Sequence, residues 1–516
     1  MFLKQGILLL GAGKEIIEIN KYIKKGKVDS IILFSRCELV DLYGSVSKYL
    51  SGKFNIIHLA YSNKEADTLK KKYKIKNILV FKKEIEKVIN ENKLNPDLIK
   101  EIDNLVINQS QGRFCLNSAI QSDRGFSNLS YNEALFLSQV YYMFWDDLIS
   151  RYKIKMILHE PTSLFFNHIA ALLCKKYSIH YFSQIMVQSD RRYSFIYIAD
   201  DDANAIELNA EYNRLSKNEI NENKVRINNF ITKITNSENI YLSEVIKVRI
   251  GYIKIILSAL KEKIYKTINP SQVNKYLDNI EFWKINSGEA KQRLINLIRY
   301  QLSLKYNKFD QALNYYYYPF HLEPEAVVLY WGDGIYKGQV KLIENIAAQL
   351  PPHTYLYVKD HPHYIGYRKV DDYLSLQKIP NIRLISPEIA GRTVIKHSLG
   401  VITINGTAGF EALMMKKQVY VFGNAFYSVS KAICKVKNIK DLREELYKNI
   451  NKVFEDDQEI NRMTLAFLNT VHEGVVDYFA HRIYSYPIDL EENSKKIADS
   501  LIILMSQKDN YSKVKL

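Results

Sequence analysis

Two short polar segments contain the residue types that could bind a phosphorylated ligand. The first spans residues 359–363 and follows an apolar run at 354–358, and the second spans 403–411 and follows a run at 399–402. Each apolar run is typical of a buried strand, so both polar segments fall where a strand would give way to a helix. Helix N-termini offer unpaired N–H groups and a positive dipole end, and open α/β sheets bind ligands there. We therefore expect an anionic ligand such as a sugar nucleotide.

In the first segment the candidate ligand-binding residues are Lys359, His361 and Pro362. An imidazole in a loop can donate a hydrogen bond to a phosphate oxygen, and Lys359 adds positive charge. Pro362 fixes the backbone and holds the loop away from the sheet. We expect His361 to contact the leaving group and so to take part in catalysis. The alternative is an ordinary turn, because a His-Pro pair by itself has little specificity.

The second segment is glycine-rich. Gly406 and Gly409 lack side chains, so the backbone could approach a ligand closely there. Thr407 is a good N-cap and could donate to a phosphate. Glu411 falls in the first helical turn, where it could accept hydrogen bonds from ribose hydroxyls or simply complement the helix dipole. The predicted donor-binding residues of this segment are Thr403, Asn405, Gly406, Thr407, Gly409 and Glu411.

The elements that would position these segments alternate between strand and helix. The predicted strands are 30–34, 55–59, 77–81, 156–158 and 180–185 in the first part of the chain, and 354–358, 382–385, 400–404 and 418–422 in the second. The main predicted helices are 64–73, 130–152, 164–176, 339–349, 389–397, 409–415, 461–479 and 490–505. Short apolar strands separated by helices imply parallel sheets covered on both faces.

This pattern predicts an α/β protein of the GT-B type, with two doubly wound, Rossmann-like domains facing a cleft. With 516 residues the chain is too long for one ordinary core. Residues 200–310 are rich in Asn, Glu, Lys and Ile, which favours a helical insertion between the domains. The predicted divisions are an acceptor-side domain at 1–199, the insertion at 200–310, a nucleotide-sugar-binding domain at 311–490 and a terminal helix at 491–516.

Two carboxylates of the first part are candidates for acid–base chemistry. Glu160 follows strand 156–158, and Pro161 keeps it in an extended loop. Asp190 follows strand 180–185, so both carboxylates would lie at the same edge of one sheet. Apolar surroundings would raise a carboxylate pKa and suit it to act as general base on an acceptor hydroxyl. Nucleophilic attack through a covalent adduct, or an ordinary salt bridge, remains open for each of them.

Composition narrows the class of partner. The net charge of +16 can attract nucleic acid, anionic lipid or anionic glycans. No nucleic-acid-binding motif is present, so nucleic acid is not an expected partner. Residues 244–268 have the pattern of a basic amphipathic helix, which either packs on its own protein or lies on an anionic inner membrane. The four scattered cysteines and the lack of a long apolar span favour a cytoplasmic protein.

The second part resembles the bacterial capsular polysaccharide synthesis proteins, which include the capsule-type Kdo transferases. The resemblance extends over residues 315–430 and rests on the motifs at 318–325, 359–362, 403–413, 418–423 and 426–427. It implies a glycosyltransferase that needs no metal and no cofactor. Its donor, a CMP-Kdo-like compound or a UDP-sugar, would be held mainly by the second domain. The acceptor would be a capsular or lipopolysaccharide glycan or glycolipid.

The resemblance also implies a catalytic carboxylate in the first domain. In the Kdo-transferase branch this carboxylate lies in an acidic-Asp-Gly-Phe motif, which the present sequence lacks. Asp190 occupies the comparable place after a late strand, whereas Asp123-Arg124-Gly125-Phe126 is a partial look-alike that falls earlier. Three other functions remain open: a nucleotide-sugar epimerase, a CDP-polyol phosphotransferase, and a non-catalytic scaffold in surface-glycan assembly.

Overall fold

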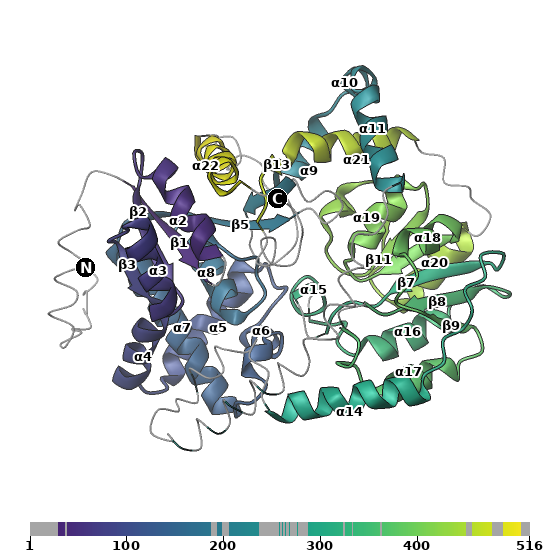
Figure 1. Ribbon diagram of the computed structural model, residues 1–516, viewed down its shortest axis with the longest axis horizontal. Coiled ribbons are helices and arrows are strands. Elements are labelled where there is room, and N and C mark those ends of the chain that lie inside the picture. The colour runs from purple at the N-terminus through teal and green to yellow at the C-terminus, as the bar shows by residue number, and fades with distance from the viewer. Residues whose placement is uncertain are drawn as a thin grey trace.

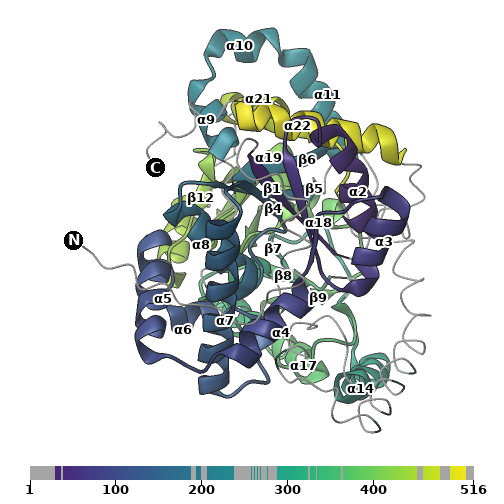
Figure 2. The same ribbon diagram turned by 90° about the vertical axis from the view of Figure 1, so that its left-hand side faces the viewer.

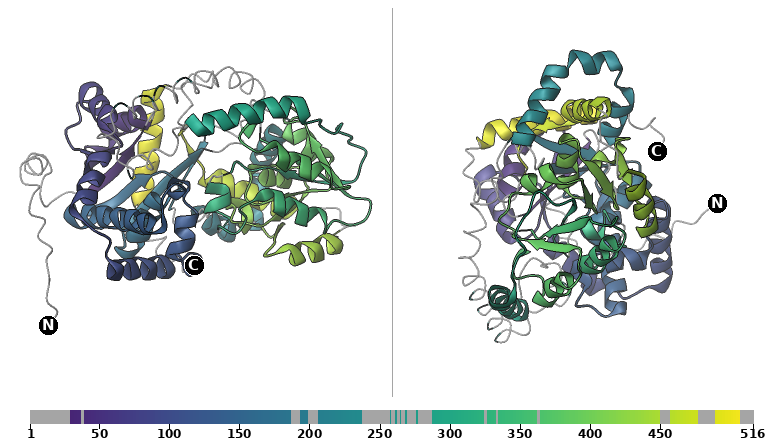
Figure 3. Two further views of the ribbon diagram at one scale, coloured as in Figure 1. Left: turned by 90° about the horizontal axis from the view of Figure 1, so that it is seen from below. Right: turned by 90° about the vertical axis from the view of Figure 1, so that its right-hand side faces the viewer.

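Two separate sheets, one mixed and one parallel and each surrounded by helices, form the two halves of the molecule (Figures 1 and 3). The structure is a computed structural model. It describes residues 29–36, 39–186, 193–198, 206–236, 287–323, 326–332, 334–361, 364–449, 457–476 and 489–506, together with positions 257, 261, 264, 268 and 276. The two-domain α/β fold predicted from the sequence is confirmed.

The first sheet has the strand order β13-β6-β5-β4-β1-β2-β3. Its strands are β1 (Ser30–Ser35), β2 (Asn55–Ala60), β3 (Ile78–Val80), β4 (Ile154–His159), β5 (His180–Met186), β6 (Tyr193–Ile198) and β13 (His472–Glu473). Strands β3, β2, β1, β4 and β5 are parallel, and β6 and β13 extend the sheet by antiparallel pairing. The predicted strand at 77–81 is shorter than expected, because Phe81 already opens a helix.

The helices of the first domain are α2 (Leu39–Leu50), α3 (Asn63–Tyr73), α4 (Phe81–Glu91), α5 (Pro96–Gln109), α6 (Leu116–Gln121), the 3-10 turn η1 (Arg124–Phe126), α7 (Tyr131–Arg151) and α8 (Phe165–Lys176). Capping boxes begin two of them: Ser62 with Glu65 at α3, and Ser130 with Glu133 at α7. Helix α7 buries Phe136, Tyr141, Phe144 and Trp145, and the Trp145 indole donates to the Phe166 carbonyl at 3.0 Å.

The second sheet has the order β12-β11-β10-β7-β8-β9, and all its strands are parallel. They are β7 (Tyr315–Pro319), β8 (Tyr355–Lys359), β9 (Ile382–Ile385), β10 (Gly400–Thr403), β11 (Gln418–Val421) and β12 (Ile433–Lys435). The surrounding elements are α15 (Ala326–Leu329), α16 (Gln339–Ala347), α17 (Val370–Gln377), α18 (Gly391–His397), α19 (Thr407–Met414), η4 (Phe426–Val429), α20 (Ile439–Asn449) and α21 (Asp457–Thr470). The four tyrosines of β7 are buried and place this strand at the centre of the sheet.

The described part of the region between the domains packs mainly on the second domain. Helices α9 (Ile206–Arg214), α10 (Lys217–Glu222) and α11 (Lys224–Asn236) arch over α21 (Figure 2). Helix α14 (Ser287–Ser303) lies against α17. Of the predicted basic helix at 244–268, only positions 257, 261, 264 and 268 are among the described residues.

The end of the chain returns to the first domain. Helix α22 (Leu490–Ser506) packs on α2, and β13 pairs with β6. The predicted helix at 461–479 was therefore too long: α21 ends at Thr470, and the chain continues as an edge strand of the first sheet. Among the described residues, no helix is long and apolar enough to cross a membrane.

Candidate functional site

The loops that follow β7, β8 and β10 meet at one edge of the second sheet. These three strands are neighbours and parallel, so their carboxyl ends lie side by side. Of the predicted residues, Lys359 ends β8 and His361 follows it in the loop. The predicted residues from Thr403 to Glu411 extend from the last residue of β10 into the first turns of α19. The structure thus brings both predicted donor-binding segments to one edge. Their roles in binding stay predictions.

His321, in the loop after β7, fixes the loop after β10. Its Nε2 lies 3.0 Å from the Thr403 hydroxyl and accepts a hydrogen bond from the Ile404 N–H at 3.2 Å. Burial, with a contribution from Arg368, lowers the pKa of His321 to about 3, so the ring is neutral. Because the Ile404 N–H can only donate, Nε2 is unprotonated and the hydrogen is on Nδ1. None of the residues that the structure describes forms a hydrogen bond with this Nδ1.

The backbone at Gly406 turns tightly into α19. The Gly406 N–H donates to the Thr403 hydroxyl at 3.1 Å, and a Cβ at Gly406 would lie 2.9 Å from His321 Cε1. Only glycine fits this space. Gly406 is the N-cap residue, which corrects the prediction for Thr407, because Thr407 is the first helical residue and is exposed. Among the described residues, none accepts a hydrogen bond from the N–H groups of Thr407 and Ala408, which lie beside the exposed Thr407 hydroxyl.

Gly409 has a packing role that the sequence did not reveal. A Cβ at this position would lie 2.2 Å from the Tyr427 hydroxyl, so the phenol fills the space expected for a ligand. That hydroxyl donates to the Gly406 carbonyl at 2.6 Å. The Asn405 side chain is also used within the protein, because it donates to the Asn424 carbonyl. Both contacts hold the turn in front of α19.

The segment after β8 is fixed through Asp360. This buried carboxylate accepts from the His361 N–H at 2.7 Å, from Arg368 at 3.3 Å and from the Tyr373 hydroxyl. Arg368 also donates to the His321 carbonyl at 3.4 Å, which connects the loops after β7 and β8. The His361 side chain is half-buried, and Pro362 lies outside the described residues.

Two charged side chains of the predicted donor site lie inside the domain. Lys359 donates to the Pro387 carbonyl at 3.4 Å, and burial lowers its pKa to about 8 against the opposing effect of Asp360 and Glu411. Glu411 Oε1 accepts from Arg392 at 2.8 and 3.1 Å. Burial raises the pKa of Glu411 even though Arg392 opposes the change. Glu411 Oε2 accepts no hydrogen bond within the part of the chain that the structure describes.

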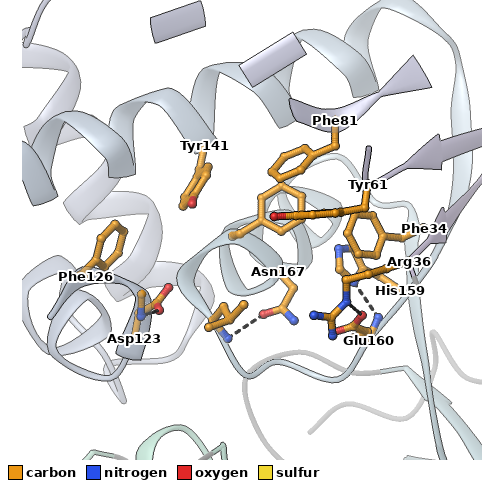
Figure 4. A pocket seen from close by; sticks show the side chains of 13 residues that line it. Phe34, Arg36, Tyr61, Phe81, Asp123, Phe126, Tyr141, His159, Glu160 and Asn167 are labelled. Atoms are coloured by element: carbon orange, nitrogen blue, oxygen red, sulfur yellow. Dashed lines mark hydrogen bonds and ion pairs between the residues drawn. The ribbon is translucent and has the colours of Figure 1, made fainter. Parts of the chain in front are cut away.

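The first sheet has a pocket at the carboxyl ends of β1, β2 and β4 (Figure 4). The space between its side chains is about 470 Å³ when the open mouth is counted. The lining residues are mostly aromatic: Phe34, Arg36, Tyr61, Phe81, Asp123, Gly125, Phe126, Tyr141, His159, Glu160, Leu164, Phe166 and Asn167.

Glu160 and Arg36 form an ion pair at one end of this pocket. Arg36 Nε donates to Oε1 and Nη2 donates to Oε2 of Glu160, both at 2.8 Å. Both side chains are largely buried. Because the Arg36 guanidinium bonds to both oxygens of Glu160, this carboxylate is less available to accept a proton from an acceptor hydroxyl, which opposes its predicted role as a general base.

Asp123 lies at the other end of the pocket. It is buried, and its oxygens accept from the N–H groups of Gly125 and Phe165, each at 2.6 Å. Burial raises the pKa of Asp123 to about 6, although the two N–H groups oppose the change. The environment predicted for the catalytic carboxylate is thus found at Asp123. Asp190 lies outside the described residues.

The second domain contacts the first beside Asp123. The Tyr330 hydroxyl donates to the Ala119 carbonyl at 3.3 Å, and the Lys337 ammonium donates to the Gln121 carbonyl. The Trp331 carbonyl, next to Tyr330, accepts from the Asn424 N–H at 2.8 Å. Residues 330–337 of the second domain thus contact the segment before Asp123. They also contact Asn424, whose carbonyl accepts from Asn405 in the turn before α19.

Several residues of the site were missed at the level of sequence. His321 is part of a motif on which the family resemblance rests, and it follows a strand as His361 does, yet no role was assigned to it. The sequence disfavours Asp123 as the catalytic carboxylate, because it falls earlier in the chain than the late strand that precedes Asp190. Arg392 and Arg368 had no recognisable signal, because nothing in the sequence connects them with Glu411 and Asp360.

A family model described as "Capsule polysaccharide biosynthesis protein" matches residues 218–455, a little under half of the chain. The match includes every motif on which the predicted resemblance rests, and it confirms that resemblance. It supports a glycosyltransferase-like function. The range also includes α10 and α11, which agrees with their packing on the second domain.

Similarity to individual proteins is weaker. Protein FixF of Sinorhizobium fredii is 25% identical over 171 residues, which is 32% of this chain and 39% of FixF. The chain thus matches about two fifths of the length of this relative.

Solved structures with a related arrangement include the UDP-GlcNAc 2-epimerase of Neisseria meningitidis, bound to UDP-GlcNAc (11% identity, 92% of this chain and 100% of that one, TM-score 0.27). Two others are the β-Kdo 2,7 transferase of Thermosulfurimonas dismutans KpsC (13% identity, 70% and 90% coverage, TM-score 0.30) and its β-Kdo 2,4 transferase (14% identity, 60% and 79% coverage, TM-score 0.31). Sequence identities and TM-scores this low do not establish which residues of these proteins correspond to residues of this chain.

Proposed function

We propose that this chain, which matches the capsule polysaccharide biosynthesis proteins over residues 218–455, is a glycosyltransferase. It would move a sugar from a nucleotide-sugar donor to a capsular or lipopolysaccharide glycan. The observation that carries the proposal is the convergence of three loops on the exposed N-terminus of α19. CMP-Kdo-like donors come first and UDP-sugars second, since the motifs resemble those of the Kdo transferases.

The donor phosphate would lie over the first turn of α19. There it would meet the free N–H groups of the helix, the Thr407 hydroxyl and the Nδ1–H of His321. His361, at the end of β8, would donate to the leaving group. Lys359 is too deeply placed for direct contact and would act through its charge. These donors and the helix dipole stabilise a departing nucleotide, so the proposed reaction needs no metal.

The acceptor would occupy the aromatic pocket of the first domain. Sugar rings pack their apolar faces on aromatic side chains, and the polar groups at each end of the pocket can orient hydroxyls. Among the described carboxylates of the pocket, Asp123 has a pKa near 6 and suits general-base catalysis better than Glu160. Asp190 remains the second candidate base.

Thermal-shift measurements with CMP, UDP, CDP and GDP test the donor site. Ligand at 100 times its Kd adds about 2.7 kcal/mol to the free energy of unfolding. In a chain of this size that corresponds to a rise in Tm of a few degrees. We expect CMP or UDP to raise Tm. If none of the four nucleotides does so, the donor site is wrong and a scaffold role is favoured. A shift with CDP alone would indicate a CDP-polyol phosphotransferase.

Product analysis with the bound nucleotide's sugar donor tests the reaction. A glycosyltransferase releases nucleotide and extends the glycan only when acceptor is present. An epimerase changes the donor sugar without acceptor. Conversion of donor in the absence of any acceptor glycan would therefore overturn the transferase proposal while leaving the nucleotide site intact.

A further inference from the structure

Helix α14 is attached to the second domain through polar and apolar contacts. The Asn296 amide donates to the Gly366 carbonyl at 3.2 Å, and Arg299 pairs with Asp371 at 2.7 Å. The Arg293 guanidinium lies 3.3 Å from the centroid of the Tyr367 ring. Leu297 packs against Gly366, and the Tyr300 ring lies edge-on to Tyr373 at a centroid distance of 6.0 Å. These contacts use one face of the helix, as in other surface helices.

A second set of apolar side chains on α14 points away from the domain. They are exposed by 43% at Leu294, 39% at Ile295, 50% at Ile298 and 80% at Leu302. At 100° per residue, these four positions fall within an arc of about 100° on the helix surface. We refer to these four residues as the α14 apolar face. Figure 1 shows the helix along the lower edge of the molecule, where such a face can meet a partner.

The surroundings of the α14 apolar face are basic. Residues 291–308 contain Lys291, Arg293, Arg299, Lys305 and Lys308 and no acidic residue. Within the basic segment 244–268, the four described side chains are exposed as well: Leu257, Lys261, Ile264 and Ile268. Their helical spacing puts them on one face, so a second stretch of the chain repeats the same combination of apolar and cationic groups.

We propose that the α14 apolar face docks on an anionic phospholipid bilayer. Its leucine and isoleucine side chains would enter the boundary between headgroups and acyl chains, with the lysines and arginines around it at the headgroups. Arg299 is already paired with Asp371 and Arg293 lies on Tyr367, so the cations left are the exposed Lys291, Lys305 and Lys308. A second copy of the chain is disfavoured as the occupant, because a two-fold contact would bring these lysines against one another. An anionic lipid surface instead complements their charge.

Vesicle flotation with the full-length chain tests the proposal. The vesicles are phosphatidylglycerol with phosphatidylethanolamine at a ratio of 3:7, compared with pure phosphatidylcholine. We expect the wild-type protein to float only with the anionic vesicles. The double variant Ile298→Gln/Leu302→Gln should lower the bound fraction by about tenfold or more, because two apolar side chains no longer enter the bilayer.

The matched control is Val225→Gln on α11, an apolar side chain that is 73% exposed and has basic neighbours. It should bind vesicles like the wild type. Absence of wild-type binding, equal binding by the double variant, or an equal loss in Val225→Gln would each overturn the proposal. A wild-type dimer that the double variant dissociates, measured by light scattering, would also overturn it. The nucleotide thermal shift should be the same in all variants, so this test is independent of the donor site.

Discussion

The carboxyl edges of the two sheets are built in different ways. At the second sheet, buried polar groups of three loops bind one another: His321 with Thr403, Arg368 with the His321 carbonyl, and Asp360 with Arg368. At the first sheet, stacked rings form the walls, as in the Phe34 and His159 pair at a centroid distance of 4.0 Å. The Arg36–Glu160 pair provides a fixed ionic contact there.

This difference corresponds to two kinds of ligand. An unpaired buried donor or acceptor costs about 1–3 kcal/mol, so the loops of the second sheet have one favoured arrangement. Such a site suits a phosphate, whose oxygens need hydrogen-bond donors at fixed positions. Ring packing is less directional, and a wall of rings suits the varied faces of a glycan. The proposed division into a rigid donor edge and an adaptable acceptor edge can be tested one residue at a time.

The largest effect is expected at the acceptor edge. Asp123→Asn should lower kcat by about 10²–10⁴-fold, because the amide cannot accept the proton of an acceptor hydroxyl. Glu160→Gln should lower kcat by less than about tenfold, because Arg36 already occupies the carboxylate. Steady-state glycosyl transfer by the purified variants measures both. Equal losses, or full turnover by Asp123→Asn, would assign the base elsewhere, with Asp190 as the next candidate.

At the donor edge, His361→Ala should lower kcat by about 10²-fold, because the leaving group loses a hydrogen-bond donor. Its Tm should stay close to that of the wild type, since the contacts of the loop run through the His361 backbone and Asp360. His397→Ala, at an exposed position at the end of α18, is the control and should keep full turnover. Unchanged turnover in His361→Ala would remove this residue from the site.

The two edges should respond to pH with opposite sign. The pKa of His321 is lowered to about 3, so the folded state binds fewer protons than the unfolded state and loses stability as pH falls below about 6.5. The pKa of Asp123 is raised to about 6, so the folded state binds more protons and gains stability as pH falls from about 6 towards 4.

Urea unfolding at pH 7 and pH 5 measures these contributions. Between pH 7 and pH 5, the free energy of unfolding of His321→Gln should fall by about 2 kcal/mol less than that of the wild type. For Asp123→Asn it should fall by about 1 kcal/mol more. The glutamine carbonyl can still accept from the Ile404 N–H, so the first variant is expected to fold. The same pH response in all three proteins would contradict the assigned environments.

The smallest effect concerns the start of α19. Thr407→Ala removes an exposed hydroxyl and should reduce the nucleotide-dependent stabilisation by about 1 kcal/mol without changing the Tm of the free protein. Thr393→Ala, at an exposed position of α18, is the matched control. Thermal shifts with the nucleotide that binds the wild type provide the measurement. Equal shifts in the two variants would place the phosphate away from Thr407.

Most strand and helix positions could be predicted, because apolar runs alternate with amphipathic segments throughout both domains. The β9 bounds agree residue by residue, whereas α21 was predicted to continue into residues that pair with β6. That pairing joins positions about 280 residues apart, and no local pattern reports it.

The candidate site could be predicted less well than the fold. The sequence located the polar segments after β8 and β10, but it did not show which side chains bind one another. His321 meets Thr403 across 82 positions, and Arg392 meets Glu411 across 19. A glycine at position 409 was predicted to make room for a ligand, but the space beside it holds the Tyr427 ring. The sequence could not show this, because the position of Tyr427 depends on the fold of the η4 turn.

The return of the chain to its starting domain affects how the protein can be made. Ile497 and Leu501 of α22 are fully buried in a cluster with Leu42 and Val46 of α2. Since a ribosome delivers residues in order, the first domain cannot close this cluster until α22, which follows the second domain in the sequence, has left the exit tunnel. The first domain is therefore completed only after the second has been synthesised, and translation products that stall before α22 would present the uncovered α2 to chaperones and proteases.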